Sequence, residues 1–192
     1  MAYFSATGTS GGTGGNNLIP NINYLHTLSY GVTQTVKVNK NDIIYIGYAQ
    51  TAPVVSGEVE QIAGAHQIYS VGYDIAYKVT NAGNITIKNA DTFYPLIFFV
   101  ITKNGKDINY QTNTTISSGI NTISDVKEGE LILGFTYNHN LTFGTTSSNV
   151  MRIFNTNATS GNFYAGALRI VEDSETASIG TSYYVTRILR LT

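Results

Sequence analysis

The sequence contains no cysteine and no tryptophan, and it has only three prolines among its 192 residues. Without cysteine, disulfides and cysteine-based metal sites are excluded. Charged residues make up only 12% of the chain, about half of the roughly 25% usual for globular domains. The 11 Lys and Arg residues are scattered, and even their densest groups, such as Arg187 and Arg190, hold only two. Because nucleic-acid-binding proteins carry a concentrated basic surface, we expect no nucleic-acid partner.

Long apolar stretches are also missing. The longest apolar run, Pro95 to Ile101, falls far short of the roughly 20 residues that span a bilayer as a helix. The first residues lack the basic and apolar regions of a signal peptide. We therefore expect no membrane insertion. A protein of this kind that works outside a cell leaves it by lysis, by a dedicated machine or within a particle, unless a leader has been removed.

What the sequence does contain favours strands. Ile, Val, Thr, Tyr and Phe are abundant, and these residues suit a pleated, half-buried surface, while the plentiful Asn, Thr and Ser are poor helix formers. Turn signals at regular spacing predict an all-β fold, an antiparallel, jelly-roll-like β-sandwich of about 10–12 strands with little helix. The best helix candidate is a short turn near Asn23 to Leu28. Residues 1–20 are predicted as a Gly-rich N-terminal arm and residues 21–192 as a single sandwich domain.

Two local patterns stand out within the predicted sandwich. Asn104-Gly105, between Lys103 and Lys106, predicts a type I′ hairpin, because both central residues of that turn need positive φ; its return strand would run from Asp107 to Thr112. Phe93 to Thr102 is predicted as a strand with a continuous apolar run. Such a run indicates either that both faces are covered or that one face lies in a subunit contact.

A short internal echo links two distant segments, Val38–Tyr48 and Val126–Phe135. Each consists of a strand, a polar turn ending in an acid, and an apolar strand that closes in glycine and an aromatic residue. One interpretation is that β-hairpins resemble one another; the other is an internal repeat. The echo is too short to establish a duplicated domain.

Residues that could support catalysis do not form a recognisable pattern. Glu58 and Glu60 would share one face of a regular strand, as a pair for glycoside chemistry or, as we favour, as a solvated strand edge. Glu172, Asp173 and Glu175 form the only acidic cluster, with the character of a surface turn. The three histidines lie in separate segments, and no nucleophile elbow or phosphate-binding loop occurs. We therefore predict no catalytic residue, no metal ligand and no cofactor.

The 14 tyrosines are the most suggestive feature. Tyrosine offers a flat apolar body and a polar tip, which suits both subunit contacts and sugar faces. Most of them are expected at the core rim and in interfaces. Residues in loops are better candidates for a ligand or receptor surface: Tyr110, Tyr137, His139 and Tyr164.

In its overall texture the chain resembles bacteriophage structural β-modules, such as tail-fibre tips, head fibres and capsid-associated proteins. The resemblance rests on the Gly/Thr/Ser-rich segment Thr7–Asn17, the Asn/Thr/Ile/Tyr-rich strands, the lack of cysteine, and the turns Asn39–Asp42 and Lys127–Glu130. The span Phe98–Phe135 also looks like part of a trimeric C1q/TNF-type jelly roll. These resemblances imply a homo-oligomer, with a trimer favoured, attached through its N-terminal part; no functional residue carries over.

The leading hypothesis is therefore a non-enzymatic structural or adhesion module of a virion or cell surface. It would assemble with itself, attach to other virion or surface proteins through the N-terminal arm, and bind a receptor through its distal loops. A second hypothesis is a carbohydrate-binding module or lectin that recognises a host-surface glycan. A third is a glycan-active enzyme, for which the sequence provides no motif.

Overall fold

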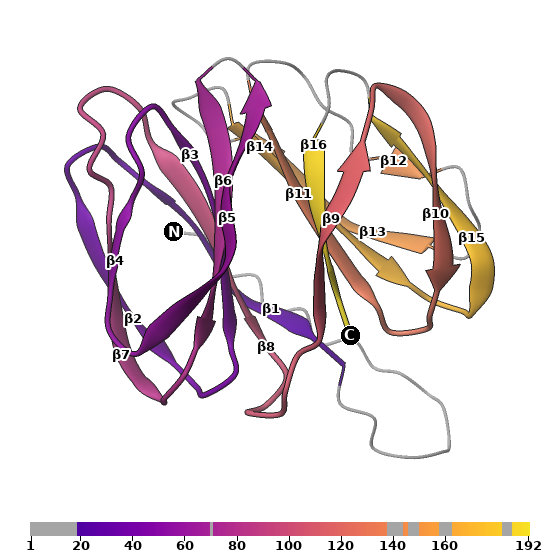
Figure 1. Ribbon diagram of the computed structural model, residues 1–192, viewed down its shortest axis with the longest axis horizontal. Helices are drawn as coiled ribbons and strands as arrows, with labels where there is room; N and C mark the ends of the chain where they lie inside the picture. The colour runs from indigo at the N-terminus through magenta and orange to yellow at the C-terminus, as the bar shows by residue number, and fades with distance from the viewer. Residues whose placement is uncertain (1–18, 70, 138–143, 146–149, 158–162, 182–185) are drawn as a thin grey trace.

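The computed structural model describes residues 19–69, 71–137, 144–145, 150–157, 163–181 and 186–192. This part of the chain folds into sixteen strands and no helix (Figure 1). The strands are β1 (Asn21–Leu28), β2 (Thr33–Val38), β3 (Ile43–Ala49), β4 (Val54–Ser56), β5 (Val59–Tyr69), β6 (Gly72–Val79), β7 (Gly83–Lys88), β8 (Leu96–Thr102), β9 (Tyr110–Ile116), β10 (Gly119–Val126), β11 (Leu131–Tyr137), β12 (Gly144–Thr145), β13 (Val150–Asn157), β14 (Phe163–Ile170), β15 (Ser174–Thr181) and β16 (Thr186–Leu191).

The strands form four antiparallel sheets. Sheet A has the order β1-β8-β3-β6-β5 and sheet B the order β2-β7-β4, both built from the first half of the chain. Sheet C has the order β13-β14-β11-β16-β9 and sheet D the order β10-β15-β12, both from the second half. The predicted all-β, antiparallel sandwich architecture is thus confirmed.

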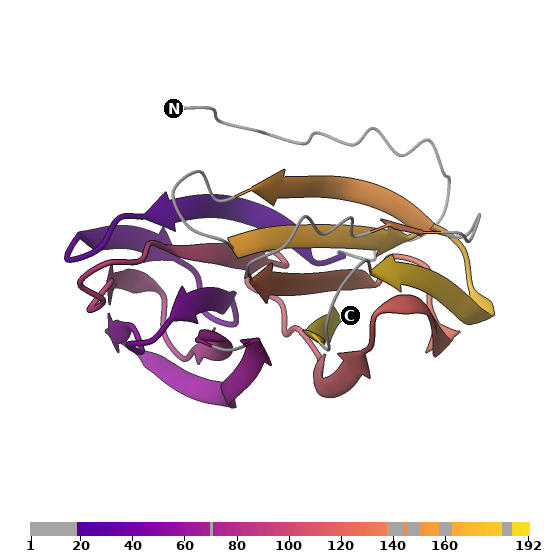
Figure 2. The same cartoon turned by 90° about the horizontal axis from the view of Figure 1, so that it is seen from above.

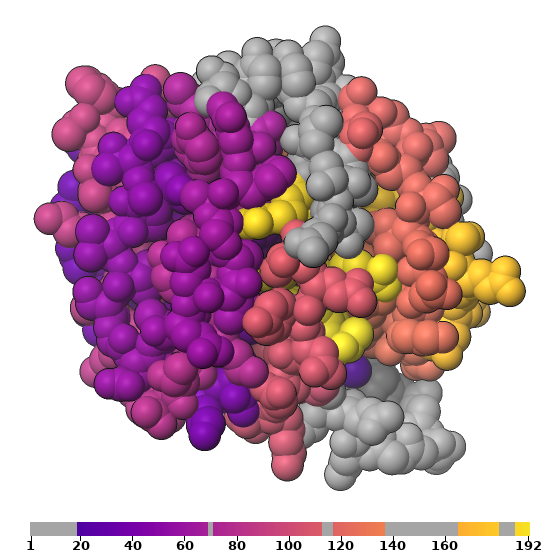
Figure 3. Space-filling model, in the orientation of Figure 1, coloured from indigo at the N-terminus to yellow at the C-terminus, as the bar shows by residue number. Residues whose placement is uncertain are grey.

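The two halves share one topology. Adding eight to each strand number of sheet A gives the neighbours found in sheet C, and sheets B and D are related in the same way. The halves lie side by side in the view from above (Figure 2), and in the space-filling view they abut across the middle of the molecule (Figure 3). The described chain is therefore one body composed of two equivalent halves.

The echo between the two segments proves to be part of this repetition. The turns before β3 and β11 are built alike: the Asn39 amide donates to Asp42 Oδ2 at 2.8 Å, and the Lys127 amide donates to Glu130 Oε2 at 3.2 Å. Both acids are buried. Asn41 and Gly129 hold equivalent positive φ angles of 70° and 81°. The short sequence match therefore marks equivalent structural positions in the two halves.

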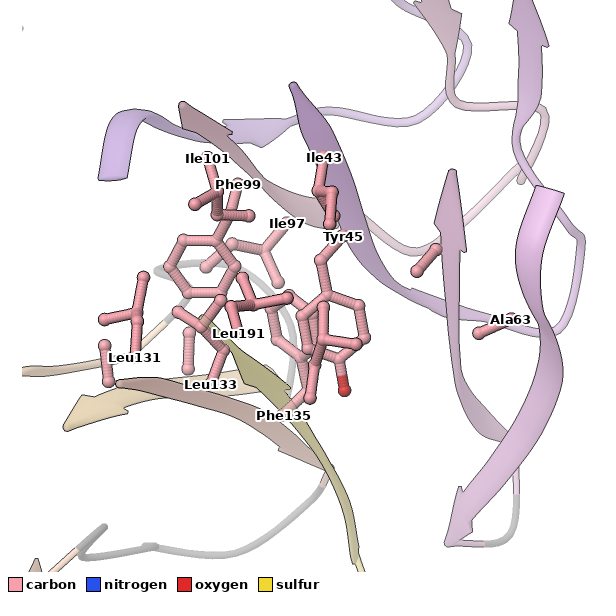
Figure 4. Packing of buried hydrophobic residues seen from close by; sticks show 14 of the residues in the cluster. Ile43, Tyr45, Ala63, Ile97, Phe99, Ile101, Leu131, Leu133, Phe135 and Leu191 are labelled. Atoms are coloured by element: carbon pink, nitrogen blue, oxygen red, sulfur yellow. The ribbon is translucent and has the colours of Figure 1, made fainter. Parts of the chain in front are cut away.

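The sheets stack in four layers in the order B, A, C, D, from left to right in Figure 1. Three buried hydrophobic clusters fill the spaces between successive layers. The central cluster joins the halves: Tyr45 and Phe99 of sheet A meet Leu133 and Phe135 of sheet C (Figure 4). The ring centroids of Tyr45 and Phe135 are 4.6 Å apart.

This layering explains the continuous apolar run of β8. Side chains alternate between the faces of a strand, so Ile97, Phe99 and Ile101 enter the central cluster while Leu96, Phe98 and Val100 face sheet B. Both faces of β8 are thus covered within one chain, which is the first of the two interpretations offered for its sequence.

Two local predictions were wrong. The segment near Asn23–Leu28 lies inside β1, where exposed and less exposed side chains alternate as a strand requires. The Asn104-Gly105 turn does form, with φ values of 50° and 77° and a hydrogen bond from the Lys106 amide to the Lys103 carbonyl. It does not close a hairpin, because β8 pairs with β1 and β3 while β9 pairs with β16.

Strand β15 was missed by the sequence analysis, which placed a surface turn around Glu172–Glu175. It has only two buried hydrophobic side chains, Ala177 and Ile179, which are too few to stand out in the sequence. The short strands β4 and β12, of three and two residues, were also missed, and the described strands therefore exceed the predicted number. Most of the predicted N-terminal arm lies outside the described residues, which begin at Ile19.

The contacts between the halves are reciprocal. Lys78 on β6 of the first half binds Asp107, which precedes the first strand of the second half, with 2.5 Å between Nζ and Oδ1. In the second half, Arg169 on β14 donates to the Pro20 carbonyl, which precedes β1, at 2.6 Å. Each half therefore holds the segment leading into the other, as expected for a pseudo-twofold arrangement.

Candidate functional site

The loop placement predicted for the ligand-surface candidates was wrong for three of them, because Tyr110, Tyr137 and Tyr164 lie in β9, β11 and β14. The four residues are also not all brought together. Tyr110 begins β9 and lies opposite Leu191, with an exposed fraction of 39%. Tyr137 and Tyr164 lie on adjacent strands, since Tyr164 is opposite Thr136. Leu131, at the other end of β11, lies opposite Leu191, as Tyr110 does. Tyr110 therefore lies near the end of sheet C that is away from Tyr137 and Tyr164. The side chains of Tyr137 and Tyr164, and all of His139, lie outside the described residues.

The carboxylates considered for catalysis lie on the surface. Glu58 precedes β5 and Glu60 lies on it, and both are exposed. β5 is an edge strand of sheet A, where exposed charge discourages pairing with other chains. Among Glu172, Asp173 and Glu175, also exposed, Asp173 accepts a hydrogen bond from the Glu128 amide at 2.8 Å. In the described ranges no group of three or more His, Asp or Glu side chains is arranged to hold a metal ion.

A buried polar cluster lies between sheets A and C. Asp74 is fully buried, and its Oδ1 is 2.5 Å from Arg187 Nη2 of the second half. The Tyr45 hydroxyl donates to Asp74 Oδ2 at 2.5 Å, and His66 Nδ1 is 3.8 Å from Oδ1. Arg187 also donates to the Gly64 carbonyl at 3.1 Å. The carboxylate is therefore occupied by a cation and a hydroxyl, and the cluster connects the two halves.

Burial controls the protonation of this cluster. It raises the pKa of Asp74, against the opposing effect of the Arg187 charge. It lowers the pKa of the His66 imidazole, which the Asp74 charge raises and the Arg187 charge lowers further. It also raises the pKa of the Tyr45 phenol well above its usual value. Burial thus favours the neutral forms of Tyr45 and His66, while the contact with Arg187 opposes protonation of Asp74.

The second polar centre is a set of three loops at one end of the first half, residues 29–32, 50–53 and 89–95, which we call the tip loops. Asn89 and Asp91, both buried, hold them together. Asn89 Nδ2 donates to the Leu28 and Tyr94 carbonyls at 3.1 and 2.8 Å, and Asn89 Oδ1 accepts from the Asp91 amide. The Asn89 backbone is also hydrogen-bonded to Gly31 and Val32.

The Asp91 carboxylate completes this network. Its Oδ1 accepts hydrogen bonds from the Phe93 and Tyr94 amides at 2.8 and 3.1 Å, and its Oδ2 accepts from the Thr51 amide at 3.3 Å. A buried carboxylate is costly unless it is hydrogen-bonded, and here three backbone donors satisfy it. The tip loops are therefore fixed by their own polar groups.

The fixed loops expose large apolar side chains. Phe93 has an exposed fraction of 75%, Tyr30 of 58% and Val32 of 44%. The sequence analysis missed this group because Phe93 was assigned to the strand that follows it. The polar run Asn89 to Thr92, ahead of Pro95, was the available signal for a loop at this position.

A scan against protein-family models finds no match, and searches of the curated proteins and of the solved structures find none either. Within the described ranges no helix is long and apolar enough to cross a membrane.

Proposed function

We propose that this chain is a non-enzymatic structural and adhesion module of a virion or cell surface, built from two jelly-roll-like halves and assembled as a homo-oligomer. The N-terminal arm would attach it, and its distal loops would meet a receptor. The jelly-roll description is supported by the strand order of each half, eight strands divided between two sheets.

The observation that carries this proposal is the orientation of the first half, whose N-terminal attachment and tip loops lie at opposite ends of β1. Arg169 holds the start of β1 through the Pro20 carbonyl and Asn21 Oδ1, and Asn21 lies opposite Thr102. The tip loops follow the other end of β1, where Leu28 lies opposite Leu96. Eight strand residues span about 25 Å, so a body attached through its N-terminal segment would present the tip loops away from the attachment.

The start of β1 is fixed firmly enough to serve as an anchor. Arg169 is buried and donates to the Gly129 carbonyl at 2.7 Å as well as to Pro20 and Asn21. Burial lowers the pKa of Arg169 to about 10, so the guanidinium stays charged at neutral pH. Any force on the N-terminal arm is therefore transmitted to the second half as well as to β1.

Assembly with further copies is supported by the outer face of sheet D. Along β10 and β15 this face carries Ile120 opposite Gly180, Thr122 opposite Ser178 and Ser124 opposite Thr176, with no charged side chain among them. Ile120 has an exposed fraction of 70%. β10 is also an edge strand, and an uncharged, partly apolar edge favours pairing with another chain.

The oligomeric state tests the proposal. We expect the full chain to form a multimer by light scattering at micromolar concentration, and a variant lacking residues 1–18 to dissociate at least in part. Ile120→Lys should also weaken assembly, whereas Val171→Lys, at another exposed apolar position, serves as the matched control. A clean monomer with the arm intact would refute the proposed assembly.

A further inference from the structure

The tip loops combine two features that the fold alone does not require. A buried carboxylate and a buried amide fix the backbone, and the same backbone exposes two aromatic rings, Phe93 and Tyr30. Exposing a large apolar side chain forgoes the free energy of burying it. Fixing loops in advance lowers the entropy lost when a ligand binds. Together these features are typical of a ligand-binding surface.

The side chains that the tip loops expose indicate which class of ligand they could bind. The exposed polar side chains are neutral, and they are Ser29, Gln50, Thr51 and Thr92. The only charged residue in the three loops is Asp91, and its carboxylate is buried and bonded to three amides. The nearest cation along the chain, Lys88, ends β7 opposite Thr33 and Val54, and alternation with the buried Ile87 directs it to the outer face of sheet B. The surface therefore offers no charge to an ionic ligand.

The small size of the tip-loop surface also argues against a large protein partner. A standard protein interface buries about 800 Å² on each side, whereas these three short loops expose only three large apolar side chains. Flat rings flanked by neutral hydroxyl and amide groups match the alternating C–H faces and hydroxyls of a sugar. Small-ligand sites are commonly built in this way, from aromatic side chains with a few fixed polar groups.

We propose that the tip loops bind a neutral glycan, with a sugar ring stacked on Phe93 and a second contact at Tyr30. Ser29, Gln50, Thr51 and Thr92 supply hydrogen bonds to its hydroxyls, and Asn89 and Asp91 act as positioning residues. The proposal rests on the adhesion role proposed above and specifies the class of receptor.

The test uses the full chain on immobilised neutral oligosaccharides of glucose, galactose and mannose, with sialylated and sulfated counterparts alongside. We expect binding to the neutral set, reduced about tenfold or more by Phe93→Ala and by Tyr30→Ala, because each change removes a stacking surface. Phe93→Trp should retain binding, and Phe93→Leu should lose it, since leucine is apolar but has no flat face. Val171→Ala, at an exposed apolar position outside both the tip loops and the proposed assembly face, is the matched control.

Three results would overturn the proposal: no binding to any neutral glycan, binding only to the acidic set, or equal binding by Phe93→Leu and the unaltered chain. The oligomeric state is measured in the same samples. A full chain that assembles normally but binds no glycan would refute this inference alone. A full chain that is monomeric but still binds glycan would refute only the proposed multimer.

Discussion

At the scale of single residues, several of the few charges of this chain are used inside the molecule. Arg187 and Arg190, three residues apart in the sequence, form ion pairs with Asp74 and Glu130, and both partners are buried. The sequence could show that these arginines are too few for a nucleic-acid surface. It could not identify their partners, since Asp74 lies on a strand more than a hundred residues away.

The Asp74–Arg187 pair should contribute strongly to stability. Arg187→Met leaves the buried Asp74 carboxylate without its cation, so we expect the free energy of unfolding to fall by about 3–5 kcal/mol. Urea denaturation at pH 7 measures this change. Replacing both partners, as Asp74→Leu with Arg187→Met, should recover much of the loss, because no uncompensated charge remains.

The matched control for this pair is Lys127→Ala. Lys127 and Asp173 are both largely exposed and 3.9 Å apart, and such surface pairs contribute about 0–1 kcal/mol. An effect of Arg187→Met as small as that of the control would show that the buried pair does not hold the halves together.

At the scale of elements, the packing of sheet A on sheet C depends on a glycine. A Cβ added to Gly47 on β3 would lie 2.9 Å from Phe135 Cγ on β11, closer than ordinary contacts allow. Gly47 therefore lets the Phe135 ring fill the centre of the shared cluster. In the sequence, Gly47 reads only as a small residue within an apolar strand, because its neighbour is supplied by the other half.

Gly47→Ala should accordingly lower the free energy of unfolding by about 1–3 kcal/mol, as overpacking does in well-filled cores. Adding Phe135→Leu should relieve part of that loss, which a double-mutant cycle followed by urea denaturation would detect as coupling. Gly64→Ala is the control, because a Cβ there meets nothing closer than 3.6 Å. Additive effects of the Gly47 and Phe135 changes would contradict the contact.

At the scale of the whole molecule, the two halves have the same strand order and make equivalent contacts with each other. Thr102 pairs with Asn21 in the first half, and Thr192 exchanges two backbone hydrogen bonds with Asn109 in the second. The segment Lys103–Lys106, which leads from Thr102 to Asp107, would then have a counterpart that leads from Thr192 to Ile19. Thr192 and Ile19 are therefore expected to lie a short linker apart.

This arrangement predicts that the chain tolerates circular permutation. A variant that begins at Gly105, ends at Asn104 and joins Thr192 to Ile19 by a copy of Lys103–Lys106 should fold, since exposed turns accept new termini. Cooperative thermal unfolding followed by circular dichroism would demonstrate it. A permutant opened between Tyr45 and Ile46, inside the buried strand β3, should not fold. Failure of the first permutant would refute the pseudo-twofold arrangement.

The sequence by itself determined the all-β class, because β-branched and aromatic residues alternate over short segments and helix-forming patterns are missing. It also revealed the Asn104-Gly105 turn, whose positive φ values are a local property, and it contained a trace of the repeat at Val38 and Val126. Only the tertiary structure decided that this turn joins two halves, that sheets A and C share a core, and that Phe93 lies on a fixed loop. These features depend on contacts between residues far apart in the chain, which local sequence patterns do not encode.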